Sequence, residues 1–267
     1  MKKLILVIAI AAIFATGSMV YAGNFGSPEP TANAGKPSLG VGYLYYSSDW
    51  KPDDTSFFGI EGVWRETDVK SDQVYIQASF SFVKNWEVYL RFGGADVKVE
   101  NAFWGLKDFK GDFKPFGTAG IKGLVYNKGY FGLGPFVQAN YIFQNFKDEI
   151  SGYVDLGGGT VVFVSDKRKY KHPWDINVGF AFYIKNEGIS LYGGPFIYWG
   201  KAKIEDEISV SGSGISISGS DSTTYKEKGN LGGYLGVKVP LGEGFNLEVE
   251  GQMKSKFSFG GALTYSF

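Results

Sequence analysis

Apolar and polar residues alternate along ten segments of this chain, and this two-residue period constrains the fold more than any other feature. Successive side chains of a β-strand point to opposite faces, so each segment predicts a strand with one apolar and one polar face. In the clearest segment, Asp175 to Lys185, every even position is Ile, Val or Phe. The ten segments span residues 38–46, 73–82, 86–92, 117–126, 130–143, 175–185, 189–204, 231–241, 245–254 and 257–267.

Short and long connections alternate between these segments. Strands that return through a tight turn at one end and a longer loop at the other form an up-and-down antiparallel sheet. The pattern therefore predicts an all-β fold, a single up-and-down barrel of ten strands, with eight or twelve strands as alternatives. The short connections lie at 84–86, 127–129, 185–188 and 242–244, and the long ones at 49–71, 100–114, 149–171 and 206–228.

The two faces of the expected strands differ in size as well as in polarity. The apolar face carries large side chains, whereas the other face mixes Gly, Ala, Ser, Asn and Gln with charges. A soluble β-sandwich would instead bury its large apolar residues in a core, and it is the competing interpretation. Bulky residues toward lipid and small or polar residues in a lumen fit the pattern better. We therefore expect a transmembrane barrel.

The first 22 residues have the form of a secretory signal peptide, because two lysines precede an apolar run and small residues end the stretch. We expect cleavage near Ala22, then a flexible periplasmic segment (23–37) and the barrel (38–267). Removal of the two lysines leaves 25 basic and 27 acidic residues, a net charge of −2. This balance gives no basic surface for a nucleic acid. The chain has no Cys, so no disulfide supports the fold.

The chain ends on an aromatic residue that continues the apolar face of the last segment. Leu263, Tyr265 and Phe267 share that face. This ending resembles the signal that the barrel-assembly machinery recognises in bacterial outer-membrane proteins. From Ser38 onward the chain resembles the small outer-membrane β-barrel class of about eight to twelve strands. The resemblance implies a porin-like barrel in the outer membrane of a Gram-negative bacterium, surrounded by lipid and lipopolysaccharide, with an insertion signal at these three residues.

The polar faces of the expected strands carry charges into the lumen. A narrow barrel of about ten strands has little free interior, so these charges are expected to form a plug of ion pairs. A charged constriction that admits small solutes is the alternative. A turn centred on Glu243 would place Lys238 directly opposite Glu248, a favourable pair. The charged residues expected to face the lumen are Glu87, Arg91, Lys122, Asp175, Lys185, Lys238, Glu248, Glu250 and Lys254.

A basic cluster and the only His lie at the expected outer rim. Lys167, Arg168, Lys169 and Lys171 suit the phosphates of lipopolysaccharide. Asp175 lies three positions after His172, so the two fall on opposite strand faces and do not form a catalytic pair. We expect no catalytic residue, no cofactor and no metal site.

Two loop features bear on function. The Ser-rich stretch 208–224 predicts either a strand pair above the membrane or a mobile loop. Phe57, Phe58 and Trp64 lie in the first long loop, where they either fold over the barrel mouth or bind a partner. We therefore expect a surface-exposed barrel, not an enzyme, whose loops have a structural or adhesive role. A narrow channel for small solutes is the alternative, and a lipid-modifying or proteolytic barrel enzyme is third.

Overall fold

A computed structural model describes residues 24–54, 56, 64–103, 107–155, 160–212 and 214–267, and this part of the chain is built from β-strands. No helix in it is long and apolar enough to cross a bilayer. The strands are β1 Pro37–Pro52, β2 Thr67–Val83, β3 Trp86–Phe103, β4 Lys107–Gly123, β5 Tyr126–Asn127, β6 Phe131–Ile142, β7 Phe146–Asp155, β8 Val161–Asn186, β9 Ile189–Gly212, β10 Ile215–Glu227, β11 Leu231–Gly242, β12 Phe245–Met253 and β13 Phe257–Ser266.

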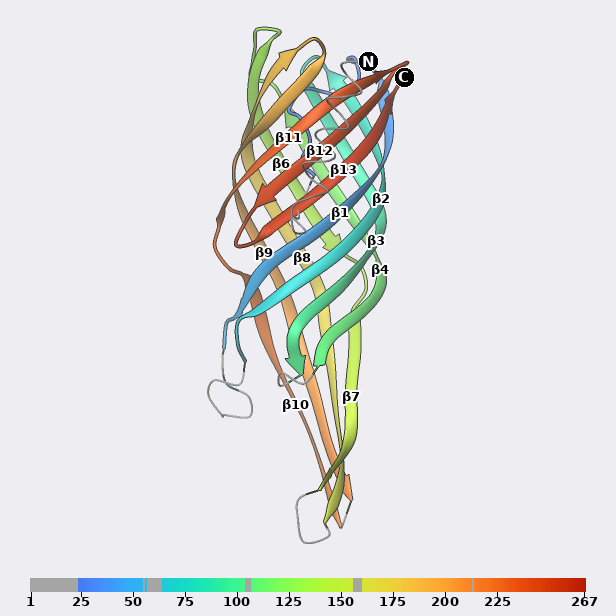
Figure 1. Cartoon of the computed structure of the whole chain (residues 1–267), viewed down its shortest axis with the longest axis vertical. Coiled ribbons are helices and arrows are strands. Elements are labelled where there is room, and N and C mark those ends of the chain that lie inside the picture. The colour runs from blue at the N-terminus through green and yellow to red at the C-terminus, as the bar shows by residue number, and fades with distance from the viewer. Residues whose placement is uncertain (1–23, 55, 57–63, 104–106, 156–159, 213) are drawn as a thin grey trace.

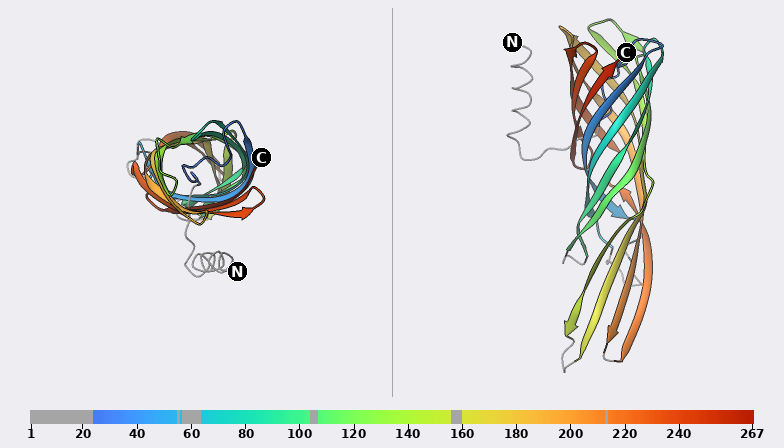
Figure 2. Two further views of the ribbon diagram at one scale, coloured as in Figure 1. Left: turned by 90° about the horizontal axis from the view of Figure 1, so that it is seen from above. Right: turned by 90° about the vertical axis from the view of Figure 1, so that its right-hand side faces the viewer.

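Ten of these strands close into a ring, which confirms the predicted antiparallel barrel (Figures 1 and 2). The ring order is β1-β2-β3-β4-β6-β8-β9-β11-β12-β13, and β13 pairs back onto β1 from Ser38–Ser266 to Tyr45–Phe259. Closure matters because a sheet edge facing hydrocarbon would leave backbone N–H and C=O groups without partners. The C-terminal segment is thus the strand that completes the wall.

Large apolar side chains cover the outside of the ring. On β2 and β3, Ile76 and Leu90 are 63% and 64% exposed, whereas the neighbouring Tyr75 and Tyr89 are 5% and 2% exposed. A water-soluble sheet would show the reverse arrangement. The outer face of this barrel therefore contacts lipid, as the residue pattern predicted.

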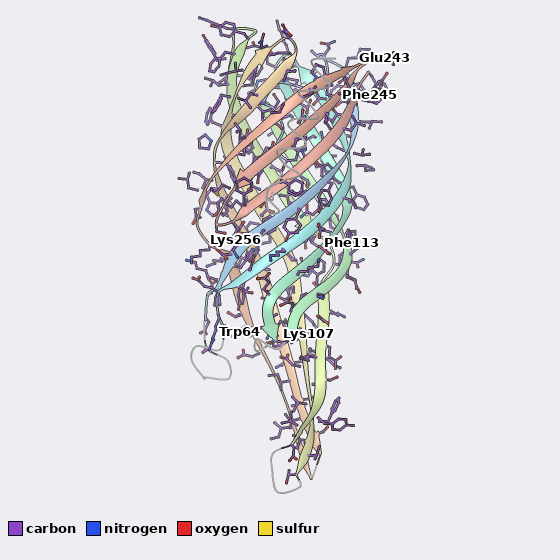
Figure 3. All side chains as sticks on the ribbon, in the orientation of Figure 1. Trp64, Lys107, Phe113, Glu243, Phe245 and Lys256 are labelled. Atoms are coloured by element: carbon purple, nitrogen blue, oxygen red, sulfur yellow. The ribbon has the colours of Figure 1, made fainter. Side chains whose placement is uncertain are left out.

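The two ends of the barrel differ in their connections. At one end the strands are joined by tight turns in which Asn85, Glu187 and Glu243 adopt positive φ angles of 74°, 48° and 49°. Figure 3 shows Glu243 at this end, whereas Trp64 and Lys107 lie toward the other. Barrels of this type have short periplasmic turns and longer extracellular loops, so we call the second end the extracellular end.

Four strands continue far beyond the ring at the extracellular end (Figure 1). β8 and β9 have 26 and 24 residues, and their outer halves pair with β7 on one side and β10 on the other. We call this four-stranded sheet, in the order β10-β9-β8-β7, the arm. The Ser-rich stretch 208–224 is therefore a strand pair, one of the two alternatives that the sequence left open.

The extracellular half of the barrel has a packed apolar core instead of an open lumen. Trp64 is 4% exposed and lies edge-on to Tyr225, with 6.2 Å between ring centroids, so it folds into the mouth of the barrel. Phe57 and Phe58 lie outside the described residues. The core includes Trp50, Val69, Ala95, Val97, Val99, Phe103, Phe109, Phe116, Ile142, Phe146, Tyr170, Ala202, Ile204 and Tyr225.

Candidate functional site

The lumen holds the charges that the sequence places on the inward faces of the strands. Glu87, Arg91, Lys122, Lys238, Glu248, Glu250 and Lys254 are buried, and Asp175 and Lys185 are partly buried. The alternation of the strands explains this position, because their outward neighbours are the large lipid-facing residues. All nine residues lie inside the barrel, and what they do there depends on their partners.

Ion pairs neutralise the charges nearest the periplasmic end. Lys238 lies directly opposite Glu248 in the β11–β12 ladder, as the predicted turn at Glu243 requires, and its Nζ is 3.5 Å from Oε1 of Glu248. Lys122 Nζ lies 3.6 Å from Oε1 of Glu87, whose side chain is fully buried. These pairs tie β11 to β12 and β3 to β4 across the inner wall.

Arg91 is held at the centre of a polar and aromatic layer. Its Nε donates to Oε1 of Gln77 at 2.7 Å and its Nη1 donates to Oε1 of Gln138 at 3.2 Å. The guanidinium also lies over the rings of Tyr75 and Tyr89, 4.9 Å and 4.8 Å from their centroids. Guanidinium groups stack well on aromatic faces. Arg91 is therefore fixed by its neighbours and does not project into a water path.

The N-terminal segment enters this lumen and binds the buried carboxylates. Oε1 and Oε2 of Glu250 accept hydrogen bonds from the backbone N–H groups of Phe25 and Gly26, at 2.7 Å and 2.8 Å. Glu87 accepts a further backbone hydrogen bond from Thr31 at 2.5 Å. Figure 2 shows the segment inside the ring when the barrel is seen from above. We call residues 24–31 the plug.

Phe25 anchors the plug by packing among three aromatic rings of the barrel wall. Its ring centroid lies 4.5 Å from that of Phe136, 4.9 Å from Phe196 and 5.2 Å from Tyr234, and Phe25 is 2% exposed. Edge-to-face aromatic contacts of this kind add to the burial energy of the ring. The structure thus corrects the expectation of a flexible periplasmic segment for residues 24–31. The only sequence signal was one aromatic residue, Phe25, in a Gly- and Pro-containing stretch.

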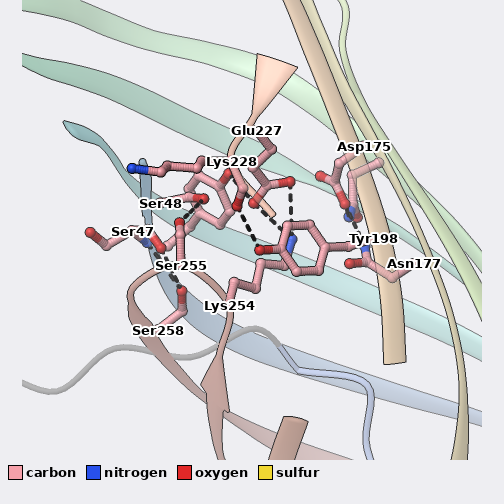
Figure 4. Close-up of polar contacts among 12 residues, drawn as sticks. Ser47, Ser48, Asp175, Asn177, Tyr198, Glu227, Lys228, Lys254, Ser255 and Ser258 are labelled. Atoms are coloured by element: carbon pink, nitrogen blue, oxygen red, sulfur yellow. Dashed lines mark hydrogen bonds and ion pairs between the residues drawn. The ribbon is translucent and has the colours of Figure 1, made fainter. Parts of the chain in front are cut away.

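A second polar layer lies on the extracellular side of the plug, and Figure 4 shows its polar contacts. Lys254 Nζ is 3.2 Å from Oε1 of Glu227 and 4.7 Å from the ring centroid of Tyr198, and Tyr46 donates its hydroxyl to Glu227 at 2.7 Å. Asp175 accepts a 2.8 Å hydrogen bond from Nδ2 of Asn140. Glu227, Tyr46 and Tyr198 were not predicted as lumen residues. Glu227 lies in the stretch 206–228, which was predicted to be a long loop.

The basic cluster at the rim is not a free cationic surface. Lys167, Lys169 and Lys171 point outward and pair with Glu149, Glu207 and Glu205 on the neighbouring strands. Arg168 points inward and forms a bidentate ion pair with Asp206. It also donates to the carbonyl of Ala102 and is 7% exposed. The expected contact of Arg168 with lipopolysaccharide is therefore corrected.

A bulge explains why Arg168 turns inward. The β8–β9 register shifts between Lys171 and Trp174, and His172 between them has a φ of 46°. One extra residue in a strand exchanges its two faces. On the periplasmic side of the bulge the odd residues of β8 face the lumen, as Asp175 does. On its extracellular side the even residues face inward, as Arg168 does.

His172 is exposed on the outer wall and its Nδ1 lies 3.0 Å from the Tyr141 hydroxyl. Asp175 lies in the lumen, so the two residues are separated as the sequence predicts. In the described parts of the chain, no group of three His, Asp or Glu residues is arranged to hold a metal ion.

Of the three residues of the expected insertion signal, Leu263 and Tyr265 lie on the outward face of β13, and Phe267 directly follows its last residue. Leu263 and Phe267 are 39% and 55% exposed, and the ring centroid of Tyr265 lies 5.0 Å from that of Phe267 and 4.9 Å from that of Phe245. The backbone N–H of Phe267 donates to the carbonyl of Pro37, the first residue of β1, at 3.3 Å. Their role in insertion stays a prediction.

Comparison with known proteins finds no matching family model and no matching curated protein. Among solved structures, the chain is similar to the Escherichia coli outer-membrane protease OmpT, with 11% identity over 90% of this chain and 100% of that chain and a TM-score of 0.47. It is also similar to the transport unit of the E. coli autotransporter AIDA-I, with 10% identity, 97% of both chains and a TM-score of 0.43. The chain is also similar to the outer-membrane protein OprG of Pseudomonas aeruginosa, with 15% identity over 90% of this chain and 99% of that chain and a TM-score of 0.37. The closed ring and its apolar outer face make this chain a small outer-membrane β-barrel.

Proposed function

We propose that the protein is a non-conducting outer-membrane barrel that carries an adhesive arm on the cell surface. The observation that carries this proposal is the filling of the lumen at two levels. The plug and the ion pairs around it fill the periplasmic half, and the apolar core around Trp64 fills the extracellular half. The charges that a channel would need along a water path are instead held by ion pairs, by amide side chains and by the backbone of the plug.

The arm offers the surface that a binding role needs. At its distal end Tyr153 is 79% exposed, Ile217 is 66% exposed and Val154 is 44% exposed. Among the described residues the distal part of β10 pairs only with β9, and its single charged residue there is Asp221. A sheet edge with few charges and no Pro is open to a further strand. We propose that this edge and the apolar tip make the adhesive contact.

The other two functions fit this geometry less well. A small-solute channel would need a continuous polar path, and the described residues place apolar side chains across the extracellular half. A barrel enzyme would need a base oriented by a second group, whereas His172 contacts Tyr141. We also propose that Leu263, Tyr265 and Phe267 are read by the barrel-assembly machinery during insertion.

We expect the purified, folded protein to show no single-channel conductance in a planar bilayer. Folding would be verified by the different gel mobility of unboiled and boiled samples. Reproducible conductance steps that change in Arg91→Ala or Glu248→Ala would show that the inward charges line a water path. That result would replace the proposed function with the channel.

Replacement of Tyr153 and Ile217 by Ser is expected to abolish adhesion without unfolding the barrel, because both side chains are exposed and lie outside the ring. The measurement is the settling rate of cells that display the protein. We expect the double variant to settle like cells without the protein, and the control Ser216→Ala, Ser220→Ala on β10 to settle like the wild type. Unchanged settling of the double variant would contradict an adhesive arm.

A further inference from the structure

The barrel wall has an irregular place where β6 gives way to β7. Pairing of β4 with β6 ends at Phe116–Ile142, and β7 begins only at Phe146. Opposite this break, β4 carries a bulge, since Ala95 pairs with Lys114 but Val97 pairs with Gly111. Two irregular segments therefore face each other, and between them lies a pocket of about 540 Å³. Bulges of this kind often re-aim side chains next to functional sites.

The pocket brings together basic groups that have no acidic partner. Lys114, Lys147 and His172 line it. Among the described residues, neither lysine has a carboxylate within 4 Å, whereas the rim lysines Lys169 and Lys171 are both paired. Unpaired lysines that line the same pocket repel each other and favour the binding of an anion there.

A buried polar atom in the same pocket also lacks a partner. Oδ1 of Asn145 is buried and accepts no hydrogen bond from the described residues. An acceptor left unsatisfied costs free energy, which a ligand hydroxyl or N–H group could recover. Asp112, exposed at the same pocket, supplies further acceptor oxygens. The pocket therefore suits a ligand that has both an anionic group and hydroxyl donors.

The position of the pocket along the membrane normal indicates the source of such a ligand. Directly on its membrane side, Tyr141, Phe143 and Trp174 are 40%, 49% and 36% exposed on the outer wall. Aromatic residues collect where lipid tails meet headgroups, so this is the headgroup level of the outer leaflet. The rings of Tyr141 and Phe143 contact each other, with centroids 5.6 Å apart, and Phe143 also lines the pocket.

We propose that this pocket binds the phosphorylated sugar headgroup of an acidic glycolipid in the outer leaflet. Lys114 and Lys147 bind the phosphate, and a ring N–H of His172 donates to it. Asn145 accepts a sugar hydroxyl, while the acyl chains run down the wall over Phe143. The site lies at the base of the arm, where β7 begins, and not at the plug or at the exposed tip of the arm. It does not depend on the adhesive role.

The test measures binding of lipid A, a bisphosphorylated glucosamine disaccharide lipid, to the folded barrel by native mass spectrometry in mild detergent. We expect Lys114→Gln, Lys147→Gln to bind at least tenfold more weakly than the wild type. The control Lys169→Gln, Lys171→Gln removes two charges at the same rim and is expected to keep the wild-type affinity. Equal weakening in both variants, or none in the first, would overturn the proposal.

Two further ligands test separately whether the pocket recognises the phosphate and whether the ligand is a membrane lipid. Dephosphorylated lipid A is expected to bind at least tenfold more weakly than lipid A, and equal binding would overturn the role of the phosphate. Soluble glucosamine 1-phosphate is expected to compete only weakly, because it lacks the acyl chains that contact the wall. Full competition by the soluble sugar would overturn the assignment to a membrane lipid.

Asn145→Ala, which leaves every charge in place, is expected to weaken lipid A binding by a smaller factor than Lys114→Gln, Lys147→Gln. Unchanged binding would overturn the role of Asn145.

Discussion

Phe25→Ala is expected to release the plug and to lower the free energy of unfolding of the barrel by about 3–5 kcal/mol. Phe25 is the only large apolar side chain of residues 24–31, and its ring fills the space between Phe136, Phe196 and Tyr234. Its removal leaves a cavity that the sheet cannot close, because those three rings are fixed on barrel strands. The free energy would be measured by urea titration of the protein in lipid vesicles.

Release of the plug can be measured separately because the chain contains no Cys. Ser27 is 0% exposed within the lumen. In a Ser27→Cys background we expect a bulky thiol reagent to react slowly, and to react rapidly once Phe25→Ala is added. Asn33→Ala, at an exposed position beyond the plug, is the matched control and should change neither the stability nor the labelling. Rapid labelling of Ser27→Cys alone would show that the plug does not occupy the lumen.

The plug variant also tests how the barrel is closed. The apolar core around Trp64 lies between the plug and the extracellular solvent. We therefore expect Phe25→Ala to remain silent in a planar bilayer even though the plug is released. The plug and the apolar core each close the lumen at a different level, so removal of the plug alone does not open a path through the barrel.

The sequence predicts the barrel well because its signal is periodic and repeated. Alternate residues of each strand point to opposite faces, so the inward position of Glu87 or Glu250 can be predicted from the apolar residues on either side of it. The plug could not be found in this way. Its backbone N–H groups bind Glu250 through a contact between residues more than 200 positions apart, and no local pattern encodes such a contact.

The arm shows a second limit of periodic reasoning. A single bulge at His172 exchanges the faces of β8, so a parity counted from Asp175 assigns Arg168 to the wrong side. Pro173, which cannot donate a backbone hydrogen bond, marks the irregularity in the sequence. It does not show whether the strand continues with its faces exchanged. The buried pair Arg168–Asp206 and the break that forms the lipid pocket both arise at such irregularities.

Arg168→Ala is expected to lower the free energy that keeps the arm closed by about 3–5 kcal/mol. Arg168 binds both carboxylate oxygens of Asp206, which is 1% exposed, and its guanidinium lies 5.5 Å from the ring of Trp64. Without it, a buried carboxylate is left without its cation. Hydrogen exchange of the amides in the paired segments 163–170 and 204–211 would measure the change. Lys169→Ala is the control. It removes an outward ion pair to the same strand and should cost less than about 1 kcal/mol.

The pH dependence distinguishes loss of the charge pair from loss of packing. Burial raises the pKa of Asp206 to about 6, in spite of the nearby guanidinium. A carboxyl group whose folded pKa lies above its unfolded value takes up a proton as the pH falls through that folded pKa, and the penalty for the buried charge then disappears. We therefore expect the cost of Arg168→Ala to be larger at pH 7.5 than at pH 5. A cost independent of pH would mean that the missing side-chain volume, and not the unpaired charge, opens the arm.

The double variant Arg168→Leu, Asp206→Leu gives the decisive comparison. Replacement of a buried ion pair by apolar residues of similar volume is often neutral or stabilising, because neither charge then has to be removed from water. The surroundings include Trp64, Phe103 and Tyr170, which already form an apolar core. We expect the double variant to recover most of the protection that Arg168→Ala loses. If it does not, Arg168 holds the arm through its hydrogen bond to the carbonyl of Ala102, and the arm is fixed to β3 by that backbone contact rather than by neutralisation of Asp206.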